Sequence, residues 1–216
     1  MNKKVIRILV LMLSIILMVS GCSEKYDAKD GNRYPIKRFK GSFTVDPNNV
    51  KAIAGFADYV FVGYVNRLTK TIYRNPVNIE TKDDGTSTIA DPYTVYEVTV
   101  VKNIKGNLIQ NQEIPILKEG GITQDKKEVQ LYEDDILPLE EKYYIFVGYA
   151  QSDGSILISG PNSNVELKDF AVDPSAKKSL INNKLSDDGQ ILKMQKAVEA
   201  QIPRDRKRFK SKYESK

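Results

Sequence analysis

The stretch that decides the fold is Tyr59-Val60-Phe61-Val62-Gly63-Tyr64-Val65. Apart from Gly63, its residues are β-branched or aromatic, the types that favour strands. A glycine inside such a strand indicates a bulge or a sharp bend. A bend allows one strand to serve both sides of a small barrel, so this stretch predicts the first strand of a barrel.

Four further strands are predicted downstream, at residues 93–104, 114–117, 141–149 and 156–158. The second alternates apolar and polar positions. Pro115 confines the third to an edge or an irregular position, and a turn at Ser152-Asp153-Gly154-Ser155 joins the last two. Five short strands predict a mainly β fold, a five-stranded antiparallel barrel of OB type. A plain β-sandwich fragment is the alternative.

Turn-forming residues predict the connections. Asn75-Pro76, Asp83-Asp84-Gly85 and Asp91-Pro92 indicate a long loop over residues 75–92, and residues 122–136 are interpreted as a polar excursion. Asp46-Pro47 predicts a short N-terminal helix over 46–55. Apolar residues at helical spacing predict a C-terminal helix over 190–201, stopped by Pro203; they are Ile191, Met194 and Val198. The Asp173-Pro174 pair repeats the helix-start signal.

The order of these parts resembles the netrin-module and tissue-inhibitor-of-metalloproteinases group. In that group a short helix leads into an Ala-Asp-hydrophobic strand, matched by Ala57-Asp58-Tyr59-Val60-Phe61-Val62-Gly63. A strand ending in Lys-Gly matches residues 100–106, and a strand, Asp-Gly turn and strand match residues 142–159. The resemblance covers about residues 46–167 and implies an OB-type barrel. The inhibitors of that group chelate the zinc of a protease through an N-terminal cysteine. Cys22 does not match that cysteine, because it is expected to be lipidated and lies far from the barrel in sequence.

The N-terminal segment resembles a bacterial lipoprotein signal. Lys3, Lys4 and Arg7 precede an apolar run over residues 8–19, too short for the roughly 20 residues that span a bilayer. The run ends in a lipobox, Val19-Ser20-Gly21-Cys22, which holds the chain's only cysteine. Residues 1–21 are therefore predicted to be a cleaved signal peptide and Cys22 the lipidated N-terminus. An uncleaved membrane anchor is the alternative.

Composition limits the chemistry that this chain can perform. It has no histidine and one cysteine, which excludes Ser-His and Cys-His pairs, histidine-ligated zinc and internal disulfides. The net charge of +5 falls to +2 without the signal peptide, because 30 basic and 28 acidic residues remain. No cofactor, no metal site and no nucleic-acid partner are therefore predicted.

Two segments flank the barrel domain (46–167) and the C-terminal helical segment (168–203). Residues 22–45 mix charges with Gly, Asn and Pro and are interpreted as a lipid-anchored tether, with an ordered arm using Ile36, Phe39, Phe43 and Val45 as the alternative. Residues 204–216 are interpreted as a disordered or frayed basic tail. Its cations are predicted to contact an anionic surface, the alternative being a solubilising terminus; they are Arg204, Arg206, Lys207, Arg208, Lys210 and Lys212.

Two residue classes could carry a site. Adjacent carboxylates, at Asp83-Asp84, Asp134-Asp135, Glu140-Glu141 and Asp187-Asp188, are interpreted as solvated turns. Tyrosines are interpreted as core and rim packing rather than a stacking platform; they include Tyr59, Tyr64, Tyr96, Tyr143 and Tyr149.

These observations predict a non-enzymatic binding module. It would be anchored by Cys22 at the extracytoplasmic face of a cell membrane, in a Gram-positive bacterium, and would bind an unknown protein or envelope ligand. Two alternatives stay open. One is a protease inhibitor that uses the barrel rim without chelation, and the other is a hydrolase built on two converging carboxylates.

Overall fold

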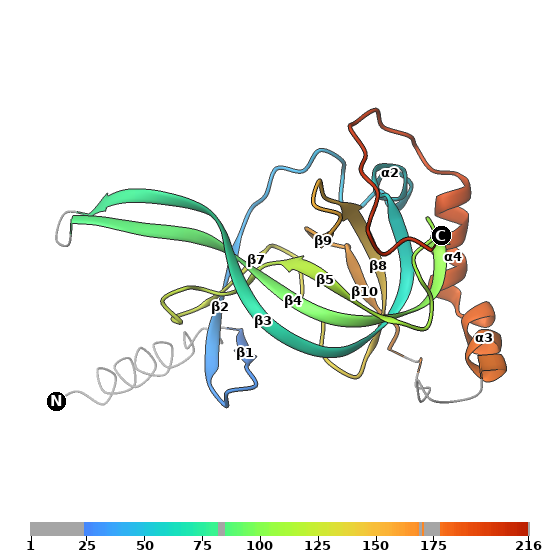
Figure 1. Ribbon diagram of the computed structural model, residues 1–216, viewed down its shortest axis with the longest axis horizontal. Coiled ribbons are helices and arrows are strands. Elements are labelled where there is room, and N and C mark those ends of the chain that lie inside the picture. The colour runs from blue at the N-terminus through green and yellow to red at the C-terminus, as the bar shows by residue number, and fades with distance from the viewer. Residues whose placement is uncertain (1–23, 82–84, 169, 171–177, 216) are drawn as a thin grey trace, which may run out of the picture.

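The computed structural model describes residues 24–81, 85–168, 170 and 178–215, and its centre is a closed β-barrel flanked by helices (Figure 1). The strands are β1 (Lys25–Asp27), β2 (Arg33–Phe39), β3 (Tyr59–Thr81), β4 (Gly85–Lys105), β5 (Glu113–Glu119), β6 (Gly121–Ile122), β7 (Val129–Tyr132), β8 (Tyr143–Ala150), β9 (Ile156–Ile158) and β10 (Asn164–Glu166). The helices are α2 (Val50–Phe56), α3 (Lys178–Asp187) and α4 (Gly189–Glu199).

The five predicted strands form the barrel. Its ring runs β3-β4-β5-β9-β8 and closes where β8 pairs with β3. All pairs are antiparallel except β5 and β9, which run parallel. Pro115 lies in the part of β5 that pairs only with β4, since β9 pairs from Leu117 onward, and the edge position, one of the two predicted for it, is confirmed. The mainly β, OB-like fold predicted from sequence is the observed one.

The first part of β3, residues 59–65, has no charged residue because both of its faces are buried. Tyr59, Phe61 and Val65 point into the barrel interior. Val60 and Val62 point outward into a second core, where they meet residues of α2 and α4. The same division applies to β8, whose Phe146 is interior and Ile145 exterior. One barrel wall thus serves two hydrophobic cores.

Gly63 lies where neighbouring side chains of this wall pack directly over its backbone. A Cβ atom at this position would lie 2.5 Å from Cγ1 of Val98 and 3.1 Å from the ring of Phe146. The register of β3 against β4 also shifts between Val62 and Gly63. Glycine is required here for the close approach, in agreement with the predicted irregularity.

The segment interpreted as a flexible tether is ordered from Glu24 onward, and that interpretation is wrong for residues 24–45. β1 and β2 form a hairpin, and β2 pairs in parallel with β7 in a small sheet of order β1-β2-β7-β6. Arg38 anchors the hairpin by donating to Glu24 at 2.9 Å and to the Asp135 carbonyl at 2.8 Å. The alternation of apolar residues in β2, which includes Ile36, was the signal for the ordered arm.

The predicted loop over residues 75–92 is also wrong. β3 and β4 continue beyond the barrel as a long two-stranded arm, seen at the left of Figure 1. A bulge between Arg74 and Val77, with Asn75 at φ 54°, accommodates Pro76 within the strand. The arm carries an exposed cross-strand pair, Val77 and Ile89. Part of the predicted polar excursion is likewise strand, as β6 and β7.

The helices cover the outer face of β3 and β8. α2 begins one turn later than predicted, because Asn49 caps it by accepting from the Ala52 N–H at 3.1 Å. The helix predicted over residues 190–201 corresponds to α4, capped by Asp188. Its Ile191 and Met194 are buried as the stripe indicated. α3 precedes it, while Asp173-Pro174 lies outside the described residues.

Segments from outside the ring close both ends of the barrel. At the tail end, where β3 begins at Tyr59, residues 204–215 cross the opening and Phe209 packs against the interior core. At the lysine end, which Lys118 marks near the end of β5, residues 133–141 cross and bind β3, β5 and β8. The interpretation of residues 204–215 as disordered or frayed helix is therefore wrong.

The lipobox and signal peptide lie outside the described residues, as do Cys22, Asp83 and Asp84. Of the helices in the part of the chain that the structure describes, none has both the length and the apolarity to cross a membrane.

Candidate functional site

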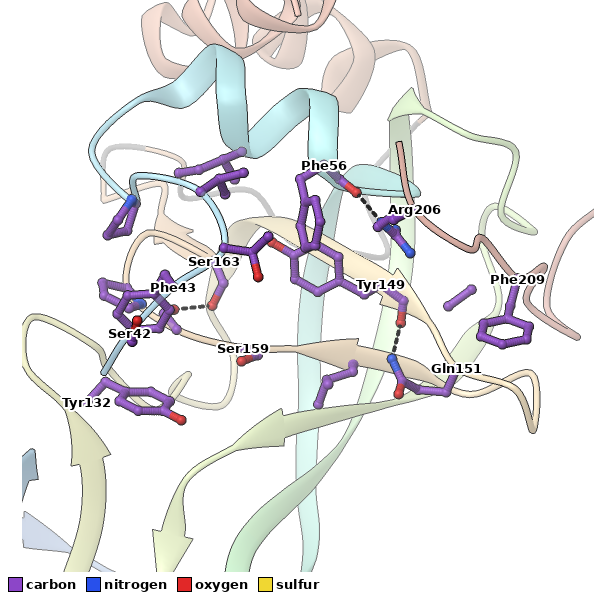
Figure 2. Close-up of a pocket in the computed structure, with 18 residues that line it drawn as sticks. Ser42, Phe43, Phe56, Tyr132, Tyr149, Gln151, Ser159, Ser163, Arg206 and Phe209 are labelled. Carbon is purple, nitrogen blue, oxygen red and sulfur yellow. Dashed lines mark hydrogen bonds between the residues drawn. The ribbon is translucent and has the colours of Figure 1, made fainter. Parts of the chain in front are cut away.

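A groove with aromatic walls runs along the outside of the barrel over β8 and β9 (Figure 2). Its volume is about 450 Å³, within the usual range of roughly 300–1,000 Å³ for ligand sites. Residues 42–47 form one side, the loop after β9 another, and the C-terminal segment the far end. The aromatic lining residues are Phe43, Phe56, Tyr132, Tyr149 and Phe209, and the polar ones include Ser42, Gln151, Ser159, Ser163 and Arg206.

One wall is built by Phe43 and Tyr132. Their ring centroids are 5.1 Å apart in an edge-on arrangement, which is favourable for aromatic pairs. Phe43 can enter because Gly160 has no side chain: a Cβ at Gly160 would lie 2.8 Å from the Phe43 ring. Gly160 also has φ +80°, a conformation that glycine adopts without strain. The Gly160 turn thus fixes the position of this wall.

The opposite wall is built by Phe56, Tyr149 and Arg206. The Phe56 and Tyr149 rings lie 5.4 Å apart, and the Arg206 guanidinium lies 4.8 Å from the Phe56 ring centroid. Arg206 donates to the Phe56 carbonyl at 3.0 Å and to Asp58 at 2.6 Å. The cation is therefore held over aromatic rings and paired with a carboxylate.

The groove carries little net charge. The Asp58 carboxylate compensates Arg206, and burial raises the pKa of Tyr149 to about 12, so this phenol is neutral at physiological pH. No aspartate or glutamate is among the described lining residues. The groove therefore suits an uncharged, apolar or aromatic ligand with a few hydrogen-bonding groups.

Behind the groove lies a buried polar cluster at the lysine end. Tyr132 donates to Glu119 at 3.1 Å, and Ser159 also donates to that carboxylate. Ser163 donates to the Gly160 carbonyl at 2.6 Å and accepts from Lys118 Nζ at 3.3 Å. Lys118 also donates to Asp135 at 2.5 Å, and both side chains are almost fully buried, with exposures of 0% and 1%.

The acidic pairs have three different roles. Asp134 is exposed while Asp135 is buried against Lys118, so the interpretation of this pair as a solvated turn is wrong for Asp135. Glu140 accepts from Lys29 and from the Leu68 N–H. Asp188 caps α4 by accepting from the Ile191 N–H at 3.0 Å. No group of three or more Asp, Glu or Cys residues that could hold a metal occurs in residues 24–81, 85–168, 170 and 178–215.

Most of the named tyrosines are packed in the cores, as predicted. Tyr59, Tyr96 and Tyr143 are each less than 4% exposed, and Tyr149 is half-buried in the groove wall. Among the described residues, the Tyr96 hydroxyl is the buried side-chain polar atom with no hydrogen-bond partner.

The six cations of the basic tail do not form one surface. Arg206 and Arg208 both bind Asp58, at 2.6 and 2.9 Å. Arg208 also donates to the Gly55 carbonyl at 2.7 Å and the Ala57 carbonyl at 3.0 Å, which caps the C-terminus of α2. The predicted contact with an anionic surface could therefore be made only by the remaining exposed cations of the six, which are Arg204, Lys207, Lys210 and Lys212.

Sequence reasoning missed Lys118 and the groove. Lys118 occupies an inward-facing position of β5, two residues after Ile116, and an inward lysine was a signal for a buried partner. The groove had no local signal, because its walls come from segments more than 150 residues apart.

No protein-family model matches this chain, and no curated protein matches it.

Proposed function

We propose that this chain is a non-enzymatic binding module, held at the extracytoplasmic face of a cell membrane through lipidated Cys22, whose aromatic groove takes an apolar segment of another envelope protein. The observation that carries the proposal is the groove itself, with aromatic walls about an uncharged space of about 450 Å³. Aromatic side chains supply large contact areas at interfaces.

The groove's polar rim favours a polypeptide over a lipid acyl chain. Ser42, Gln151 and Ser159 bring hydroxyl and amide groups to the lining. A peptide backbone has N–H and C=O groups that must be paired when they are buried, and an acyl chain has none. Side chains of the partner would pack against the aromatic walls, while its backbone would form hydrogen bonds with the polar groups of the rim.

The proposed anchoring rests on the lipobox, and the ordered β1–β2 hairpin close to Cys22 supports a fixed position of the domain relative to the membrane. β1 begins at Lys25, three residues after Cys22. A lipid on Cys22 would therefore hold the β1–β2 hairpin directly at the membrane surface, without a flexible spacer. A binding module in this geometry would present its groove at a fixed distance from the bilayer.

Photocrosslinking in the producing cell tests the groove. A benzoylphenylalanine placed in the full chain at Phe43 or at Phe209 should give a protein adduct of defined mass after irradiation. The matched control is the same residue at Leu192, which is exposed on α4. Adding Ser42→Trp, which fills the groove, should remove the adduct. Equal adducts from Leu192, adducts with lipid or glycan only, or no adduct would each contradict the proposal.

Membrane fractionation tests the anchor separately. Each methylene of the two acyl chains contributes about 0.8 kcal/mol to membrane binding when it is buried in the bilayer. The native chain should therefore remain with membranes through a high-salt wash. Cys22→Ala should release the chain or leave the precursor uncut, and palmitate labelling that survives in this variant would overturn the anchoring. A protease as the crosslinked partner would instead favour inhibition at the barrel rim.

A further inference from the structure

The lysine end of the barrel holds an amine and a carboxyl group in direct contact, away from water. Lys118 Nζ lies 2.5 Å from Asp135 Oδ2, and both side chains are almost fully buried. Lys118 points inward from β5, and Asp135 is on the segment that crosses this end of the barrel. The backbone holds both groups in place, because β5 pairs with two strands and the Asp135 N–H donates to the Tyr132 carbonyl at 3.2 Å.

Burial drives this pair toward its uncharged form. Desolvation lowers the pKa of Lys118 and raises the pKa of Asp135. The nearby Glu119 carboxylate adds to the rise at Asp135. A proton that passes from the ammonium to the carboxylate leaves a neutral amine, which is a nucleophile, beside a neutral carboxylic acid, which is an electrophile.

The surroundings also supply the groups that acyl transfer requires. The Ile136 N–H donates to Asp135 Oδ1 at 2.8 Å, so a hydrogen-bond donor already contacts the oxygen on which negative charge would develop. The Ser163 hydroxyl accepts a hydrogen bond from Lys118 Nζ at 3.3 Å and helps to orient the nitrogen. The two reacting groups are thus oriented within one rigid site.

We propose that Lys118 and Asp135 form an intramolecular isopeptide bond. Lys118 Nζ attacks Cγ of Asp135 to give a tetrahedral intermediate whose Oδ1 anion is held by the Ile136 N–H. One proton leaves the nitrogen and passes to the departing Oδ2 hydroxyl, the Cγ–Oδ2 bond breaks, and one water molecule is released. The product is an amide between Nζ and Cγ, and no oxidant, reductant or other co-reactant is consumed.

The bond would fix the lysine end of the barrel covalently. It would tie the end of β5 to the segment 133–141, and so to β3 and β8, which that segment binds. This chain has a single cysteine and cannot form an internal disulfide. A Lys–Asp amide would give an exported domain a covalent staple that reduction cannot open.

A tryptic map of the full, denatured chain tests the proposal. Trypsin needs a free lysine, so the bond should block cleavage after Lys118. The expected product is a branched species in which residues 106–126 are joined to residues 128–142, with a mass lower by one water than the sum of the two peptides. Fragmentation should place the link between Lys118 and Asp135.

The chain contains its own control. Lys29 also contacts a carboxylate, Glu140, but this pair is largely exposed, so cleavage after Lys29 should be complete. Lys118→Arg should abolish the branched species. If this variant fails to fold, the native map still decides: recovery of most of the chain as the linear peptide 106–118 would overturn the proposal.

Discussion

The two ends of the barrel are closed by polar contacts of different kinds. At the lysine end a single Lys118–Asp135 pair is buried away from water. At the tail end Asp58 meets two arginines, and the side chains of Arg206 and Arg208 are 17% and 37% exposed. A contact buried away from water is out of reach of salt ions, whereas an ion pair at a wet surface is screened by them. The lysine end should therefore behave as a permanent closure and the tail end as one that responds to salt.

Breaking the buried pair should give the largest effect. Asp135→Ala leaves the Lys118 amine buried without its partner and should lower the free energy of unfolding by about 3–5 kcal/mol. The double variant Lys118→Met with Asp135→Leu removes both polar groups and should be more stable than Asp135→Ala alone. Guanidinium unfolding of the three chains measures this. A double variant no more stable than Asp135→Ala would contradict a buried pair.

Gly63 lies in the wall between the two ends and gives the second largest effect. Gly63→Val places atoms against Val98 and Phe146 and should cost about 1–3 kcal/mol through overpacking, with Gly63→Ala costing less. The loss should add to that of Arg208→Ala, which is distant. An unchanged midpoint of thermal unfolding in Gly63→Val would show that the wall has room for a side chain at this position.

The tail end should show a smaller loss. Arg208→Ala removes bonds to Asp58 and to the last carbonyls of α2, and should cost about 0.5–1.5 kcal/mol at low salt because the side chain is partly exposed. The loss should shrink at about 1 M salt, where the screening length is about 3 Å. Lys210→Ala, at an exposed neighbouring position, is the control and should stay within about 0.5 kcal/mol of the native chain. Equal losses in the two variants would mean that Arg208 caps nothing.

Lys105 gives the smallest expected effect, a dependence on pH. Its ammonium donates to the Ala54 carbonyl and to Gln201, both at 2.7 Å. Burial, reinforced by Arg208 and Arg206, lowers the pKa of Lys105 from 10.5 to about 8. The folded chain then binds fewer protons than the unfolded chain between these values, so stability should rise with pH from 8 toward 10.

Lys105→Met should remove most of that rise in urea unfolding at pH 8 and pH 10. Above pH 10 the trend should reverse in both chains, because Tyr149 has its pKa raised to about 12 in the fold while the unfolded phenol ionises near 10. An identical slope between pH 8 and 10 in the two chains would contradict the shift at Lys105.

The same contrast between local and distant contacts explains what the sequence could predict. The five barrel strands and the Gly63 irregularity follow from residue types within a few positions of one another. Residues 24–45 and 204–215 were misinterpreted because their order depends on distant partners, β7 for one and Asp58 for the other. Asn75-Pro76 suggested a loop because the bulge that accommodates Pro76 in β3 exists only when β3 is paired with β4. The groove, assembled from three distant segments, could not be predicted.

Hydrogen exchange at both ends of the barrel in one experiment tests the central claim most directly. The reporters at the lysine end are the N–H groups of Ile136 and Leu139, and those at the tail end are Ser211 and Lys212. Raising the salt from about 0.05 M to about 1 M should speed exchange at Ser211 and Lys212 and leave Ile136 and Leu139 unchanged. An equal response at both ends would contradict the claim that one closure is permanent and the other is released by salt.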